Sequence, residues 1–136
     1  MDLPKILCHF DGSCKPRNPG GNMGFGVVMK ADGIVFHEWT NFVRAHPHNS
    51  NNVAEYGALE YCLNKLVEMG LTDHEIEIRG DSKLAIEQMS GHWRMKKGMY
   101  FQYAMACKEL LTKFDNLKFK WVPRHLNQEA DQLSKA

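Results

Sequence analysis

The feature that most constrains the fold is an aspartate, Asp11, that directly follows a short apolar run over Ile6–Phe10. The run has the length and composition of a buried strand, and the glycine- and proline-rich segment 12–21 predicts that it ends at Asp11. The alternating segment Glu75–Arg79 shows the same arrangement, because Asp81 follows it closely. A carboxylate at the carboxyl end of a central strand faces a cleft, where α/β proteins place their chemistry. The pattern therefore predicts an α/β fold with a site at one edge of its sheet.

Two further strands follow the first and are joined by a short turn. Met23–Lys30 and Ile34–Val43 are rich in β-branched and aromatic residues, and Ala31–Gly33 has the composition of a hairpin turn. The three strands together predict an antiparallel meander. Gly24 and Gly26 lie inside the second strand, where glycine marks a bulge or a close backbone approach.

Helices and strands then alternate. Apolar residues recur at spacings of three and four over Val53–Met69, which predicts a helix that Asn52 caps and Gly70 ends. The later elements are a strand over Glu75–Arg79, helices over Ser82–Met89 and Met99–Phe114, a strand over Leu117–Val122 and a helix over Leu126–Lys135, which Asn127 is placed to cap. The order is βββαβααβα. A right-handed crossover through the long helix allows the first and fourth strands to lie side by side and parallel.

Length and composition favour one domain over residues 1–136. The chain is 43% apolar, enough for a core, and it has no run of about 18 apolar residues that would cross a membrane. Four widely spaced cysteines argue against a disulfide framework or a zinc site. The first residues lack the pattern of a signal peptide, so we expect a cytoplasmic protein with reduced thiols. Nothing in the sequence requires an oligomer, and we expect a monomer.

Four acids carry the chemical hypothesis: Asp11, Glu55, Asp81 and Asp131. Three of them also have a structural interpretation, since Glu55 occupies a capping-box position, Asp81 an N-cap position and Asp131 the surface of a helix. If they converge, four carboxylates suit Mg²⁺ or Mn²⁺ better than Zn²⁺. A pair of such ions activates water and stabilises the leaving oxygen of an in-line phosphoryl displacement. The predicted reaction is phosphodiester hydrolysis.

The residues around these acids resemble those of type 1 ribonuclease H. The matching segments are Asp11–Cys14 with Asn18–Gly21, Asn51–Glu55, Gly80–Ser82, Gly91–Trp93, Trp121–His125 and Asn127–Leu133, in the family's order over nearly the whole chain. The resemblance implies a five-stranded mixed sheet flanked by helices. It also implies an endonuclease that cleaves the RNA strand of an RNA–DNA hybrid and leaves 5′-phosphate and 3′-hydroxyl ends.

The resemblance further implies roles for single residues. Asp11 would bridge two metal ions, Mg²⁺ or Mn²⁺, that are present with substrate. Glu55 and Asp81 would complete one metal site, and Asp131 would help to hold the ion that activates water. His125 matches a loop histidine that assists water activation or product release in many relatives, although several relatives with a short loop lack it. Its alternative is an exposed histidine or a phosphate contact.

Substrate contacts are also implied by the resemblance. The predicted residues are Gly12, Ser13, Cys14, Asn18, Asn51 and Asn52 in the minor groove, Ser50 in a DNA-phosphate pocket, Trp93 against the DNA strand, and the basic Arg124. A net charge of +1 does not itself indicate a nucleic-acid partner, so the local basic clusters carry this expectation. Many relatives carry a basic protrusion where this chain has only His92–Lys97.

Three alternatives remain open. The domain could act on double-stranded RNA as well, or bind hybrids without cleaving them, although loss of an acid would be expected in a silent module and all four are present. A related exonuclease is disfavoured, because such enzymes usually place a second acid two residues after the first and Ser13 stands there.

Overall fold

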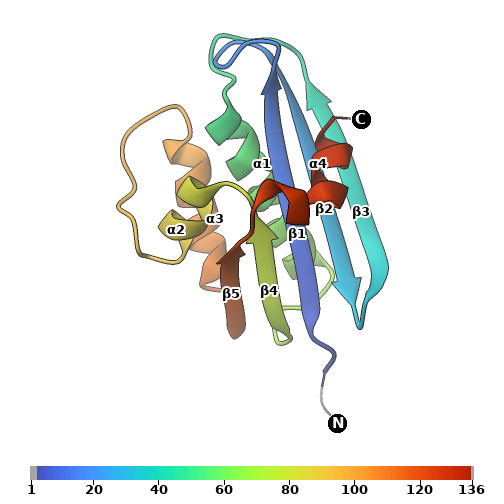
Figure 1. The fold of residues 1–136 in the computed structure, drawn as a ribbon. Coiled ribbons are helices and arrows are strands. Elements are labelled where there is room, and N and C mark those ends of the chain that lie inside the picture. Colours follow the sequence, from blue (N-terminus) through green and yellow to red (C-terminus); the bar gives the residue numbers. More distant parts are fainter. Residues whose placement is uncertain (1–2, 136) are drawn as a thin grey trace.

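A computed structural model describes residues 3–135 as one mixed sheet with helices on both faces (Figure 1). The strands are β1 (Ile6–Lys15), β2 (Asn22–Ala31), β3 (Ile34–Val43), β4 (Glu75–Gly80) and β5 (Asn116–Trp121). The helices are α1 (Asn51–Glu68), α2 (Lys83–Met89), α3 (Phe101–Leu111) and α4 (Gln128–Ser134), with a 3₁₀ turn η1 (Arg124–Leu126) before α4. The predicted order of elements is confirmed.

The sheet has the order β3-β2-β1-β4-β5, with β1 at its centre. β1 and β2 pair antiparallel, as do β2 and β3, which confirms the predicted meander. β4 pairs parallel to β1 and to β5. The fold class is therefore the predicted five-stranded mixed sheet.

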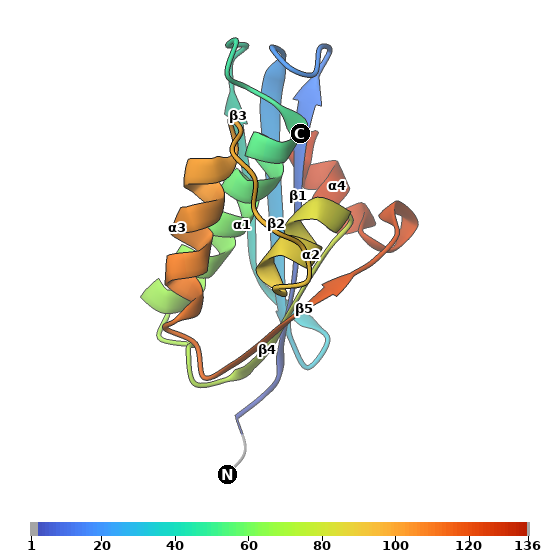
Figure 2. The same cartoon turned by 90° about the vertical axis from the view of Figure 1, so that its left-hand side faces the viewer.

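The helices divide between the two faces of the sheet. α1 and α3 lie on one side and α4 on the other, which is plain when the sheet is seen edge-on (Figure 2). The main core fills the α1 side, where Phe10, Leu59, Leu63, Ile76 and Ile78 are fully buried. No helix within residues 3–135 has the length and apolar character needed to cross a membrane.

β1 is longer than predicted, and this changes the setting of Asp11. We expected the strand to end there, but it continues to Lys15 because β2 pairs with it as far as Lys15↔Asn22. The parallel partner β4 stops earlier, at His9↔Arg79. At Asp11, strand β1 is therefore paired with β2 on one side and is unpaired on the side of β4, so the carboxylate lies beside an open sheet edge.

The glycines of β2 are explained by α4. A Cβ on Gly24 would lie 1.7 Å from the carbonyl oxygen of Ser134, and one on Gly26 would lie 2.3 Å from that of Ala130. The predicted close backbone approach is therefore confirmed. The irregularity in the β2–β3 pairing lies elsewhere, between Met29 and Lys30.

The predicted cap of α1 is wrong, and the predicted cap of α4 occupies its position without a side-chain capping bond. Ser50, not Asn52, caps α1, because its side chain accepts a hydrogen bond from the amide of Val53 at 3.1 Å. Asn127 makes no capping bond to α4; its Nδ2 donates instead to the carbonyl of Phe10 at 2.9 Å. This bond fastens the start of α4 to β1 directly before Asp11.

Candidate active site

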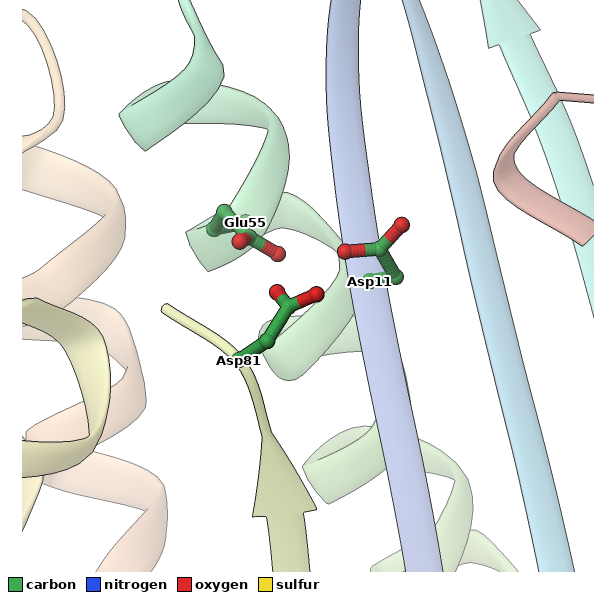
Figure 3. A group of neighbouring side chains, drawn as sticks. All are labelled: Asp11, Glu55 and Asp81. Carbon is green, nitrogen blue, oxygen red and sulfur yellow. The ribbon is translucent and has the colours of Figure 1, made fainter. Parts of the chain in front are cut away.

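Three of the predicted acids meet at the open edge of β1. Asp11 comes from the strand, Glu55 from the second turn of α1, and Asp81 from the residue after β4, and their carboxylates point toward one another (Figure 3). One oxygen from each lies within 4.8 Å of the others. The β1–β4 register explains the first pair, since continuing it two residues past His9↔Arg79 places Asp11 opposite Asp81.

Glu55 reaches the sheet because Gly12 lets the helix touch the strand. A Cβ on Gly12 would lie 2.2 Å from the carbonyl carbon of Ala54 and 2.4 Å from the amide nitrogen of Glu55. The amide of Gly12 donates to Oε1 of Glu55 at 2.7 Å. Glu55 is therefore no capping-box residue. Gly12 also lines the cleft, so its predicted contact with the RNA strand stays a prediction.

Asp81 does not cap a helix either. The side chain of Ser82 accepts a hydrogen bond from the amide of Ala85 at 3.2 Å and so caps α2. The indole Nε1 of Trp121 donates to the carbonyl of Asp81 at 3.2 Å, and the amide of Val122 donates to Gly80 at 3.0 Å. Strand β5 thus fixes the backbone that carries Asp81, and its carboxylate is left to face the cleft.

Asp131 lies next to Asp11, although it is outside the group of three acids whose oxygens all lie within 4.8 Å of one another. Its carboxylate pairs with Lys135, four residues on along the helix, at 3.0 Å and with Arg124 at 3.4 Å. The side chains of Asp131 and Asp11 interact directly, and Ser134 joins them further, since its buried hydroxyl donates to Oδ2 of Asp11 at 2.8 Å. The same hydroxyl lies 2.8 Å from the carbonyl of Asp131.

The acids have opposite electrostatic environments. Burial, with the neighbouring charge of Asp81, raises the pKa of Asp11 to about 8. Burial and the charge of Asp11 also raise the pKa of Glu55 well above its ordinary value. Burial would raise the pKa of Asp131 too, but hydrogen bonding from Lys135 and the charge of Arg124 outweigh it and hold that pKa below the usual range. Asp131 therefore has cationic partners in Lys135 and Arg124, whereas the charges that act on Asp11 and Glu55 are those of neighbouring carboxylates.

The acids line an open cleft of about 410 Å³. Cationic side chains surround the carboxylates there: Lys15, Lys83, Arg124 and Lys135. Negative groups at the floor with positive groups at the walls suit a polyanion that approaches together with divalent cations.

The cluster of three fits such cations. Every donor is a carboxylate oxygen, the ligand type that Mg²⁺ and Mn²⁺ prefer. Two of the acids are buried beside one another, and ionising both without a cation is unfavourable, which is the cause of their raised pKa values. Asp131 would join such a site only by exchanging at least part of its contacts with Lys135 and Arg124.

Several predicted substrate residues form one connected segment beside the cleft. The side-chain oxygen of Asn51 accepts from the amide of Cys14 at 2.9 Å, and that of Asn18 accepts from the amide of Asn51 at 2.9 Å. Asn52 lines the cleft, as do Gly12 and Ser13. Ser50 directly precedes α1 and caps it, so its hydroxyl already accepts a hydrogen bond from the amide of Val53.

Five predicted residues lie outside the cleft lining: Cys14, Asn18 and Ser50, which belong to the hydrogen-bonded segment just described, and His125 and Trp93. His125 is exposed in the turn η1, whereas its neighbour Arg124 lines the cleft and pairs with Asp131. Trp93 is 46% exposed on the loop between α2 and α3. The structure therefore brings Arg124, rather than His125, to the acids.

Sequence reasoning missed three residues that support the acids. Ser134 and Lys135 follow Asp131 by three and four positions, which is the spacing of neighbours on one face of a helix and could have identified them. The sequence analysis named Trp121 only as part of the segment Trp121–His125. Its hydrogen bond to the carbonyl of Asp81 depends on the parallel pairing of β4 and β5.

Comparison with known proteins identifies relatives of this chain. Residues 9–136 match the family described as reverse transcriptase-like. A ribonuclease HI from Halobacterium salinarum is 35% identical over 131 residues, which is 96% of this chain and 62% of that protein. The bifunctional protein Rv2228c of Mycobacterium tuberculosis is equally similar, but the chain spans only 34% of its length.

Solved structures show the same fold. The N-terminal RNase H domain of Rv2228c superposes with a TM-score of 0.85 at 33% identity, over 98% of this chain and 92% of that one. LC11-RNase H1 in complex with an RNA/DNA hybrid also gives a TM-score of 0.85 at 33% identity, over 96% of this chain and 94% of that one.

Proposed function

The chain belongs to the reverse transcriptase-like family and has ribonucleases H among its relatives, and from that premise we propose that it hydrolyses the RNA strand of RNA–DNA hybrids. The products would be 5′-phosphate and 3′-hydroxyl ends. The observation that carries the proposal is the convergence of Asp11, Glu55 and Asp81 within 4.8 Å at a cleft walled by cationic side chains.

The four acids would hold two divalent cations, Mg²⁺ or Mn²⁺. When bound, such ions supply an activated water and a stabilised leaving oxygen. Asp11 lies between Asp81 and the Ser134 hydroxyl, which suits it to the bridging position. Glu55 is oriented by the amide of Gly12, and Asp81 by the backbone contacts of β5. Arg124, whose present partner is Asp131, would be free to bind a phosphate if Asp131 served as a metal ligand.

Recognition of the hybrid would use the segment from Gly12 to Asn18 and the start of α1. The side-chain oxygens of Asn18 and Asn51 accept bonds from the protein, so their N–H groups would contact the RNA strand in the minor groove. Trp93 and the basic residues around it would contact the DNA strand. Because most contacts would involve the backbone, binding should be salt-sensitive and nearly independent of sequence.

A cleavage assay on labelled hybrid, duplex RNA and duplex DNA, with each metal in turn, tests the proposal. We expect the RNA of the hybrid to be cut with Mg²⁺ or Mn²⁺ and duplex DNA to stay intact. Equal cleavage of duplex DNA, or no cleavage with either metal, would contradict it. Cleavage of duplex RNA would extend the substrate range, and binding of the hybrid without cleavage would identify a non-catalytic module. We further propose a cytoplasmic monomer.

A further inference from the structure

A buried hydrogen-bond network joins α1 to α2 next to the carboxylates. Its centre is Gln88 near the end of α2, which is 1% exposed. The phenol of the fully buried Tyr56, the residue after Glu55, donates to Oε1 of Gln88. The amide Nε2 of Gln88 lies 3.1 Å from the phenol oxygen of Tyr100 and donates to the carbonyl of Arg94, also at 3.1 Å. Both ends of the buried amide are thus satisfied.

The network reaches the loop between α2 and α3 (residues 90–100), which we call the α2–α3 loop. Tyr100 closes that loop, and its phenol oxygen also accepts from the amide of Lys96 at 3.4 Å. The rings of Tyr56 and Tyr100 stack, with centroids 5.5 Å apart and an interplanar angle of 9°. Gln88 and Tyr100 therefore hold the loop backbone at two points, Arg94 and Lys96, against α1.

The ends of the α2–α3 loop are held differently. The amides of His92 and Trp93 donate to the carbonyl of Glu87 at 2.9 and 3.1 Å, which continues the last turn of α2. The amide of Phe101 donates to Gly98 at 3.1 Å and begins α3. Half-buried Met95 packs against the core. The middle of the loop, which runs across the front of Figure 2 between α2 and α3, takes its polar anchorage from Gln88 and Tyr100.

The side chains on this part of the loop form a nucleic-acid contact set. Arg94, Lys96 and Lys97 are exposed, and Trp93 beside them is 46% exposed. Basic groups interleaved with an aromatic ring suit a phosphate backbone and a stacked or packed base. Long flexible side chains lose less entropy on binding when the backbone that carries them is already fixed.

We infer that Gln88 is a positioning residue for binding of the hybrid, because it holds the α2–α3 loop in the conformation that presents Trp93 and its basic neighbours. This inference rests on the proposed function. Gln88 touches none of the acids and meets the contact set only at the backbone carbonyl of Arg94, so its effect is on substrate affinity rather than on turnover. An apolar side chain of similar length would fill the same space in the core but would release the loop at Arg94.

Gln88→Met tests the inference. We expect KM for the hybrid to rise by about five-fold or more while kcat at saturating substrate stays within about two-fold of the original protein. The slope of log affinity against log salt, measured by anisotropy with labelled hybrid, should become shallower because fewer loop cations engage phosphates. Tyr100→Phe, which keeps the ring stack and loses the phenol oxygen, should act in the same direction, and the double variant should add little.

Ile76→Val is the matched control, because it thins the buried core at β4 without touching the loop. It should lower the melting temperature and leave KM and the salt slope unchanged. If Gln88→Met lowers the melting temperature but leaves KM and the salt slope unchanged, Gln88 is purely structural and the inference fails. A fall in kcat at constant KM would overturn it as well. Absence of hybrid cleavage by the unmodified protein would instead count against the proposed function, and the anisotropy measurements would still test the loop.

Discussion

Asp11 is held in a charged state only at a cost, because it is buried beside Asp81 and its pKa is raised to about 8. The ionised carboxylate of Asp11 therefore lowers the stability of the folded protein, at a position that suits a cation ligand. Ser134 offsets part of that cost, since its hydroxyl bonds to Oδ2 of Asp11 at 2.8 Å and lowers the pKa of the carboxyl. Functional sites commonly keep such unfavourable groups.

Asp11→Asn should remove activity and leave the protein folded. The amide keeps the shape of the side chain but loses the charge that a divalent cation needs, so we expect kcat below about 5% of the original value. The readouts are hybrid cleavage and circular dichroism. Asp73→Asn changes an exposed acid before β4 and should leave both unchanged. A variant with most of its activity intact would remove Asp11 from the bridging position.

Ser134→Ala should weaken cation binding. Partners that orient a ligand typically contribute 10- to 100-fold in metal affinity, and we expect a loss of about 10-fold. Calorimetric titration with Mn²⁺ measures it directly, and the Mn²⁺ concentration for half-maximal cleavage should rise in parallel. Gln132→Ala, an exposed neighbour on the same helix, is the control. Equal Mn²⁺ affinity in the two variants would show that the hydroxyl does not orient Asp11.

At the scale of elements, α4 is the part of the site with the least local support. It is only seven residues long and takes its position from β2 and β1. Gly24 and Gly26 let its carbonyls approach the strand, Ser13 donates to the carbonyl of Ser134 at 3.2 Å, and Asn127 ties its start to Phe10. An isolated helix of this length would not form in water, so packing alone places Asp131.

Gly26→Ala should therefore reduce activity by displacing α4. The added methyl would lie 2.3 Å from the carbonyl of Ala130, and overpacking of this kind costs about 1–3 kcal/mol. We expect a lower melting temperature together with a large loss of cleavage at temperatures where the protein is still folded. Gly33→Ala is the comparison, since it strains a turn at φ +78° but meets no atom within 4 Å. It should lower stability and leave cleavage unchanged; similar activity in the two variants would contradict the role of α4.

Local patterns predicted most elements well. β3 and β4 are found at or within one residue of their expected bounds. In β4 the alternation of apolar residues follows burial directly, whereas β3 is largely exposed and was predicted from its β-branched and aromatic residues. β1 was predicted too short, since its second half is polar and is a strand only through pairing with β2. The cap of α1 was assigned to Asn52 instead of Ser50, because several neighbouring polar residues could serve. Asn127 stands at the predicted N-cap of α4, but a tertiary contact with Phe10 takes its side chain.

At the scale of the whole molecule, the acids couple stability to pH. Asp11 has its pKa raised from 3.8 to about 8 by folding, so between those values the folded protein keeps a proton that the unfolded chain has released. Stability then falls as pH rises, because the folded state binds more protons than the unfolded state. Glu55 shifts in the same direction. Asp131 has a lowered pKa and acts oppositely, but only in the acid range below its ordinary value.

In the presence of EDTA, the melting temperature should therefore fall between pH 5.5 and pH 8.5. Mg²⁺ should raise the melting temperature more at pH 8.5, where the carboxylates are free of protons and accept the cation. Asp11→Asn should flatten the dependence on pH. Thermal unfolding of both proteins at the two pH values measures this. A melting temperature that rises with pH in EDTA, or an unchanged slope in Asp11→Asn, would show that the buried carboxylates do not govern it.

The sequence alone determined the kinds of residue at the site and the order of the elements. Carboxylates next to strand ends and helix starts, with glycines between them, are local patterns, and they sufficed to predict an α/β fold and a site for divalent cations. The motifs also resemble those of type 1 ribonuclease H, and the comparisons support this resemblance. These features follow from short-range spacing, which a single chain displays without folding.

The tertiary structure decided which groups meet. Asp11 lies beside an open sheet edge because the pairing of β4 with β1 ends at His9↔Arg79. Gly12 packs against α1 and Gly26 against α4. Asp131 pairs with Lys135 and Arg124 and is not part of the cluster of three. The bond between Ser134 and Asp11 joins residues 123 positions apart. Such contacts depend on sheet register and helix packing, which no local pattern encodes, and they determine which carboxylates remain available to bind cations.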